Sequence, residues 1–179
     1  QLYDENVTAA LRTAKLLDGN QRALAKAVGD VIRGTSKAGK ELDALPVAMK
    51  RDALYTFARV HLLRVTGKIE AAANVLAAAP RDPKVIVDPD AWWIERRLIS
   101  RQLIDAGNPK LAYQLAAGHA NESATLRAEA EFHAGWYALE YLRDPGTASR
   151  HFANIAAIST MPLSLSRAEY WLGRASAAA

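Results

Sequence analysis

Tryptophan and arginine side chains stand together in one short segment, Asp90-Ala91-Trp92-Trp93-Ile94-Glu95-Arg96-Arg97. Adjacent residues of an α-helix point about 100° apart, so one of the two tryptophans can be buried while the other is partly exposed. An exposed indole ring can stack on a sugar, and an arginine beside it can bind a carboxylate. We therefore take Trp93, Arg96 and Arg97 as the candidate ligand contacts. Ordinary packing of arginine against tryptophan is the alternative.

The other residue types that catalyse reactions or bind metals form no recognisable site. The four histidines, His61, His119, His133 and His151, do not have the spacing of a metal site. Glu129 and His133 lie four residues apart, but such a pair is usually a surface or core contact. The absence of cysteine excludes disulfides, thiolate metal sites and cysteine nucleophiles. We therefore predict no catalytic residue, no metal and no cofactor in this chain.

Two aromatic segments lie about 35 residues apart in the last third of the chain, at residues 130–139 (AEFHAGWYAL) and 167–175 (RAEYWLGRA). A small residue next to a bulky one allows neighbouring helices to interlock. We therefore expect Trp136 and Trp171 in the core, with sugar stacking as the alternative. Arg174 is expected to be partly buried and to bond a glutamate or the carbonyl groups at the end of a helix.

The composition predicts that helices alone position these residues. Alanine, the best helix former, occupies 37 positions, and only Val85-Ile86-Val87 forms a β-branched run. We therefore expect one all-α domain over residues 1–179, with an ordered connection from Pro80 to Asp88. Apolar periodicity predicts helices at about residues 4–18, 21–33, 36–45, 50–66, 68–79, 90–106, 109–118, 123–142, 145–158 and 164–178.

A weak internal repeat joins these helices in pairs. Each of three units has a leucine, a turn four residues later and an alanine five residues after that, with periods of 40 and 36 residues. The leucines are Leu63, Leu103 and Leu139, the alanines are Ala72, Ala112 and Ala148, and four residues further lie Leu76, Ala116 and Phe152. This period predicts an α-solenoid, or superhelix, of tetratricopeptide-like helix hairpins. Two of the three units lack the aromatic and proline pattern of the tetratricopeptide consensus.

The turns of this repeat carry residues suited to helix ends. Gly67 and Gly107 can adopt the left-handed conformation that ends a helix. Pro109 and Pro145 suit the first turn of the next helix, where a missing N–H costs nothing. Asp90 is expected to cap the helix that carries the tryptophan pair.

Together, the tryptophan pair and the two aromatic segments resemble the helical U-shaped domain of bacterial soluble lytic murein transglycosylases. The resemblance runs from about Leu54 to Ala179 and is densest after Asp88. It implies a helical ring or horseshoe against which a lysozyme-like catalytic domain docks. It also implies a periplasmic parent enzyme that cleaves the β-1,4 bond between N-acetylmuramic acid and N-acetylglucosamine and forms a 1,6-anhydro product.

The resemblance implies a scaffold, not the catalytic part of such an enzyme. In the family, the catalytic glutamate is followed by serine and then by Gly-Leu-Met-Gln. Here Glu122-Ser123 is followed by Ala124-Thr125-Leu126-Arg127, and Gly-Leu-Met-Gln occurs nowhere. We expect Asn121 or Ser123 to cap a helix at this point. The expectation is therefore a fragment that lacks the catalytic domain and is inactive alone.

The partners expected from the resemblance are that catalytic domain and peptidoglycan glycan strands, the latter contacted by Trp93, Arg96 and Arg97. A tetratricopeptide-like adaptor that binds proteins is the alternative, because it would have the same repeat. The net charge of +4 and a pI of about 9.4 would suit a nucleic-acid-binding solenoid, but no block of five like charges is present, so we expect no nucleic acid. The sequence contains no run of 18 apolar residues, so we expect no membrane span.

Overall fold

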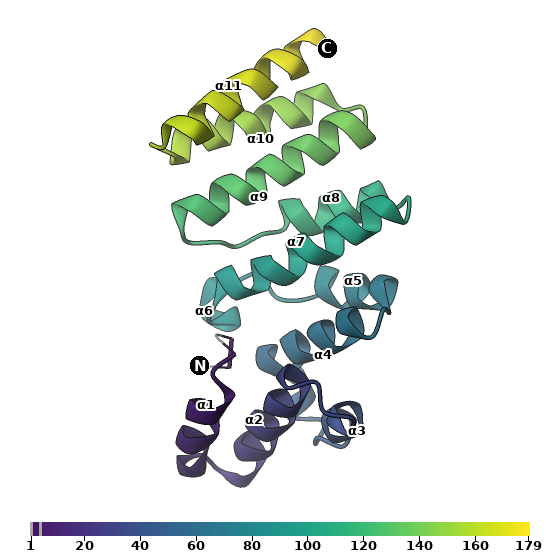
Figure 1. The fold of residues 1–179 in the computed structure, drawn as a ribbon, viewed down its shortest axis with the longest axis vertical. Coiled ribbons are helices and arrows are strands. Elements are labelled where there is room, and N and C mark those ends of the chain that lie inside the picture. The colour runs from purple at the N-terminus through teal and green to yellow at the C-terminus, as the bar shows by residue number, and fades with distance from the viewer. Residues whose placement is uncertain (1, 4) are drawn as a thin grey trace.

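The computed structural model describes residues 2–3 and 5–179 of the chain. These residues contain eleven α-helices and no β-strand, which confirms the predicted all-α class. The helices follow one another along the long axis, from α1 at one end to α11 at the other (Figure 1). They are α1 (Val7–Thr13), α2 (Gly19–Ile32), α3 (Ala38–Asp43), α4 (Ala53–Val65), α5 (Ile69–Ala77), α6 (Pro83–Ile86), α7 (Pro89–Asp105), α8 (Pro109–Ala117), α9 (Ala124–Trp136), α10 (Pro145–Ile158) and α11 (Pro162–Ala177).

The first and eighth predicted helices are each divided in the structure. The first range, 4–18, contains α1 and then a 3₁₀ turn at Ala14–Leu16, while its first residue lies outside the described residues. The eighth range, 123–142, contains α9 and then a π-helical turn, η3 (Tyr137–Tyr141). A second 3₁₀ turn at Met49–Arg51 precedes α4, where a continuous helix from residue 50 was expected.

The connection from Pro80 to Asp88 contains one short helix, α6, that the sequence analysis did not predict. The Asp82 side chain accepts a hydrogen bond from Lys84 N, and Pro83 occupies the first turn, so local cap chemistry starts this helix. Burial holds it in place, since Ile86 is only 2% exposed and its carbonyl accepts a bond from Trp92 Nε1 at 3.2 Å.

The three predicted helix hairpins are present, because α4 packs on α5, α7 on α8, and α9 with η3 on α10. All nine repeat positions are buried: Leu63, Leu103, Leu139, Ala72, Ala112, Ala148, Leu76, Ala116 and Phe152. The buried alanines allow the two helices of each hairpin to approach closely. The sequence repeat therefore marks the inner face of each hairpin.

The turn residues behave as predicted in the first two hairpins, where Gly67 and Gly107 have φ of 74° and 75°. In the third hairpin Arg143 occupies the equivalent position with φ of 56°, although a side chain disfavours this conformation. There the bond that closes the turn also spans one residue more. Asp144 N donates to Ala138 O at 2.9 Å, six residues back, whereas Lys68 N donates to Leu63 O, five residues back. The π-helical turn η3 accommodates this additional residue.

The helix caps agree with the prediction at three points and differ at one. Pro109 and Pro145 lie in the first turns of α8 and α10, and the Ser123 hydroxyl accepts a bond from Leu126 N at the start of α9. The expected Asp90 cap is wrong. Asp88 caps α7 instead and accepts from Ala91 N, because Pro89 occupies the first helical position and shifts the start of the helix.

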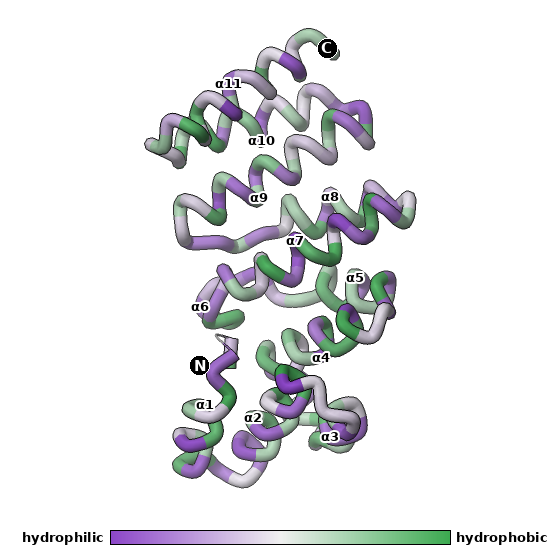
Figure 2. The backbone as a smooth tube through the Cα atoms, viewed as in Figure 1, coloured by the Kyte–Doolittle hydropathy of each residue, from purple (hydrophilic) through white to green (hydrophobic). Residues whose placement is uncertain are grey.

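Hydrophobic side chains form three successive clusters along the molecule, and hydrophobic and hydrophilic residues alternate along the helices (Figure 2). The central cluster contains Trp92 and Trp93, which are 1% and 0% exposed. Trp136 and Trp171, the expected core tryptophans, are only partly buried. They lie at the margins of the central and C-terminal clusters, where the neighbouring helices leave part of each ring uncovered.

Candidate functional site

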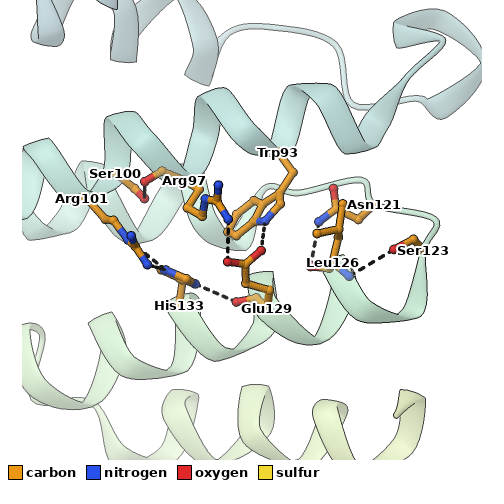
Figure 3. Close-up of polar contacts among 9 residues, drawn as sticks. All are labelled: Trp93, Arg97, Ser100, Arg101, Asn121, Ser123, Leu126, Glu129 and His133. Atoms are coloured by element: carbon orange, nitrogen blue, oxygen red, sulfur yellow. Dashed lines mark hydrogen bonds and ion pairs between the residues drawn. The ribbon is translucent and has the colours of Figure 1, made fainter. Parts of the chain in front are cut away.

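The segment that the sequence marks as a ligand site lies on α7, packed against α9. Trp93 is fully buried, so the expectation of an exposed indole is wrong. Its Nε1 donates to Glu129 Oε2 at 3.0 Å, and Arg97 Nη1 donates to Glu129 Oε1 at 2.8 Å. Figure 3 shows both side chains pointing from α7 to this carboxylate on α9. The structure therefore brings Trp93 and Arg97 together on a glutamate of the protein.

Hydrogen bonding keeps the Glu129 carboxylate ionised. Burial by itself raises the pKa of Glu129, but bonds from Trp93 and Arg97 outweigh burial and lower the pKa below its usual value. Because the indole and the guanidinium satisfy one oxygen each, this arrangement acts as a clamp between α7 and α9.

Arg96 takes no part in this clamp and is only 2% exposed. Its Nη1 lies 3.5 Å from the carbonyl of Leu115, in the last turn of α8. Burial, together with the nearby charge of Arg81, lowers the pKa of Arg96 to about 10, so the side chain remains charged at pH 7. A cation at the end of a helix interacts favourably with the helix dipole. Arg96 therefore stabilises the end of α8 and does not present a ligand contact.

A second clamp joins the opposite side of α7 to α4. Glu95, which is 3% exposed, accepts bonds from Arg64 Nε at 2.6 Å and Arg64 Nη2 at 2.8 Å. His61 Nδ1 lies 2.9 Å from the same carboxylate. Burial by itself raises the pKa of Glu95, but Arg64 and His61 outweigh it and lower the pKa. Helix α7 is therefore joined to a helix on each side, to α4 by a buried charge pair and to α9 by a half-buried one.

His133 on α9 takes part in the packing of α7 as a neutral side chain. Arg101 Nε and Nη2 lie 3.3 and 3.1 Å from His133 Nε2, so that nitrogen accepts. The other ring nitrogen, Nδ1, donates to Glu129 O at 2.8 Å. Burial lowers the pKa of His133, which favours this neutral form. The predicted pairing of Glu129 with His133 is thus a core contact made through the backbone carbonyl.

A third cluster, around Glu131, joins residues that the sequence does not connect. Its carboxylate lies 3.3 Å from His119 Nε2, 2.6 Å from His151 Nδ1 and 3.2 Å from Asn154 Nδ2. Burial raises the pKa of Glu131, but these three bonds outweigh burial and lower it to about 2. The two histidines lie 12 and 20 residues from Glu131, so no local spacing could have predicted the cluster.

These clusters provide packing rather than reactive groups. The carboxylates of Glu95, Glu129 and Glu131 are each bonded to at least two protein side chains. Within the described residues, no group of three or more potential ligands is arranged to hold a metal ion. Glu122, the residue compared with the catalytic glutamate, is exposed just before α9. Arg174 bonds Glu140 Oε1 at 3.1 Å, as expected, but the expectation that Arg174 is partly buried is wrong, since its side chain is exposed on α11.

Comparison with protein-family models, with curated proteins and with solved structures finds no match to this chain. In the part of the chain that the structure describes, no helix has both the length and the hydropathy needed to cross a bilayer.

Proposed function

We propose that this chain is a non-catalytic helical scaffold of a peptidoglycan lytic transglycosylase. In this proposal its hairpins form a tetratricopeptide-like solenoid that supports a catalytic domain and guides glycan strands in the bacterial periplasm. Support comes from the resemblance of the aromatic segments, and from three successive hairpins whose repeat positions are all buried.

The observation that carries the scaffold role is the position of α7 between two ionic clamps, a buried one at Glu95 and a half-buried one at Glu129. Glu95 joins α7 to α4, and Glu129 joins α9 to α7. A buried charge whose partner is displaced is strongly destabilising, so the Glu95 clamp opposes any change in the relative placement of α4 and α7. The half-buried Glu129 clamp opposes movement of α9 less strongly, because solvent screens part of it. Three consecutive units are thus held in one geometry, as a support for a docked domain requires.

The alternative is a tetratricopeptide-like adaptor that binds other proteins, which the same hairpins would suit. The coding sequence distinguishes the two. A scaffold of this enzyme class should be followed, in the same reading frame beyond Ala179, by Glu-Ser and Gly-Leu-Met-Gln. A complete frame without that motif would overturn the transglycosylase proposal and favour the adaptor.

A second test concerns activity. The chain should release no 1,6-anhydro-muropeptides from purified sacculi, since Glu122 has neither the Gly-Leu-Met-Gln context nor a buried environment. Product chromatography after incubation measures this directly. Release of anhydro products that disappears in Glu122→Gln would contradict the non-catalytic role.

A further inference from the structure

An aromatic pocket of about 290 Å³ lies between the last turns of α7 and the π-helical turn that follows α9. It is lined by Arg101, Ile104 and Asp105 of α7 and by Trp136, Tyr137 and Tyr141. Its volume is at the lower end of the range for small-molecule sites, so it suits one ring rather than a long chain.

The π-helical turn builds the aromatic wall of this pocket. In an α-helix, residues five apart point in widely different directions, as the 3.6-residue period requires. The π-turn, closed by Leu142 N to Tyr137 O at 3.1 Å, has a wider repeat that brings Trp136 and Tyr141 to one side. Their ring centroids lie 5.6 Å apart at an interplanar angle of 81°, which forms a corner with two aromatic faces. Tyr141 is 41% exposed, and Trp136 is partly exposed.

The polar groups around this corner are available to a ligand. Among the described residues, Asp105, the Trp136 indole N–H and the Tyr141 hydroxyl have no hydrogen-bond or ion-pair partner. His133 holds Arg101 Nε and Nη2, which orients the guanidinium and leaves Nη1 unbonded within the same residues. Asp105 is also the last residue of α7, where the helix dipole disfavours a negative charge. The Asp105 carboxylate therefore neither stabilises the end of α7 nor bonds a neighbouring side chain.

From this geometry we infer that the pocket binds one pyranose ring of an oligosaccharide. A pyranose has an apolar face that packs on an aromatic ring and hydroxyl groups that both donate and accept hydrogen bonds. The pocket offers both an aromatic face and a mixture of donors and an acceptor. A quaternary ammonium ion also binds aromatic corners, but Arg101 offsets the charge of Asp105 and so disfavours a cation.

The pyranose class follows from the pocket, whereas the choice of an N-acetylglucosamine ligand rests on the proposed function. The test is an NMR titration of the chain with tri-N-acetylchitotriose, followed through the indole N–H signals. Trp171 supplies an internal control, because its ring lies outside the pocket. We expect the chemical shift of the Trp136 indole N–H to change and that of Trp171 to stay the same. The dissociation constant should be roughly 1 mM, because an open pocket gives weak binding.

Two variants with matched controls assign the contacts. Tyr141→Ala should weaken binding about tenfold, the loss expected for one aromatic contact. Asp105→Asn should weaken it about fivefold, because a charge-assisted hydrogen bond is replaced by a neutral one. Tyr170→Ala and Glu122→Gln change an exposed tyrosine and an exposed glutamate outside the pocket and should bind like the unaltered chain. Asp105→Asn should also keep or raise the melting temperature, which separates lost binding from lost folding.

The outcomes separate this pocket from the proposed function. Binding of cellotriose but not of chitotriose would support a pyranose site and count against a peptidoglycan role. A Trp136 shift with tetramethylammonium but with neither sugar would replace the inference with a cation site. No shift with any probe, or equal affinity in all four variants, would overturn it. The reading-frame test of the proposed function does not depend on any of these binding results, so the two hypotheses can fail separately.

Discussion

At the scale of single residues, we expect truncation of Trp93 to decrease the stability of the fold most. Trp93→Ala removes a ring that is 0% exposed and leaves the Glu129 carboxylate with one partner fewer. We expect a decrease of about 3–5 kcal/mol in the free energy of unfolding, the range for large aromatic truncations in cores. Trp136→Ala should cost clearly less, since that ring is partly exposed. Urea denaturation of both variants measures the difference, and equal losses would contradict the assignment of Trp93 to the core.

The free energy of unfolding should depend on pH through the Glu131 cluster. The folded pKa of Glu131 is lowered from 4.5 to about 2, so its contribution is complete above about pH 4.5 and is lost as the pH falls towards 2. Glu131→Gln should therefore lower stability at pH 7 by about 3 kcal/mol and flatten the acid limb of the stability profile. Urea melts from pH 7 to pH 2 test this. The exposed control, Glu122→Gln, should leave the profile unchanged.

At the scale of helices, Gly135 sets the distance between α9 and α10. A Cβ atom there would lie 2.6 Å from the Phe152 ring, which is fully buried. Gly135→Ala should destabilise by about 1–2 kcal/mol, because overpacking outweighs the better helix propensity of alanine. Gly173→Ala in α11 is the matched control, since nothing lies within 4 Å, and it should stabilise by about 0.5–1 kcal/mol. Thermal melts that show the same sign for both would contradict close packing at Gly135.

At the scale of the whole molecule, stability should be greatest around α7. This helix buries nine residues and is clamped on both sides, whereas α11 buries only Ala168 and Ala175. Backbone amides are protected from hydrogen exchange where buried contacts oppose local opening. We expect the slowest exchange in α7 and faster exchange in α11, measured by mass spectrometry of peptic fragments. Equal protection of the two helices would show that the clamps do not concentrate stability at the centre.

The sequence alone determined those features that depend on neighbours in the chain. Alanine content and apolar period predicted the all-α class, and glycine at Gly67 and Gly107 predicted the turns. The spacing of Leu63, Leu103 and Leu139 predicted the three helix hairpins that the structure contains. Helix propensity, capping and turn conformation act over a few residues, so they are readable without a fold.

Only the tertiary structure decided what the charged and aromatic side chains of α7 contact. Trp93 meets Glu129, 36 residues away, and Arg96 meets the carbonyl of Leu115, 19 residues away. Of the three expected sugar contacts, Trp93 and Arg96 are therefore buried and Arg97 is partly buried. The pocket at Trp136 and Tyr141 depends on a π-helical turn that no local signal predicted. Which face of a helix is covered depends on how the neighbouring helices cross it, and that geometry is a property of the whole packing.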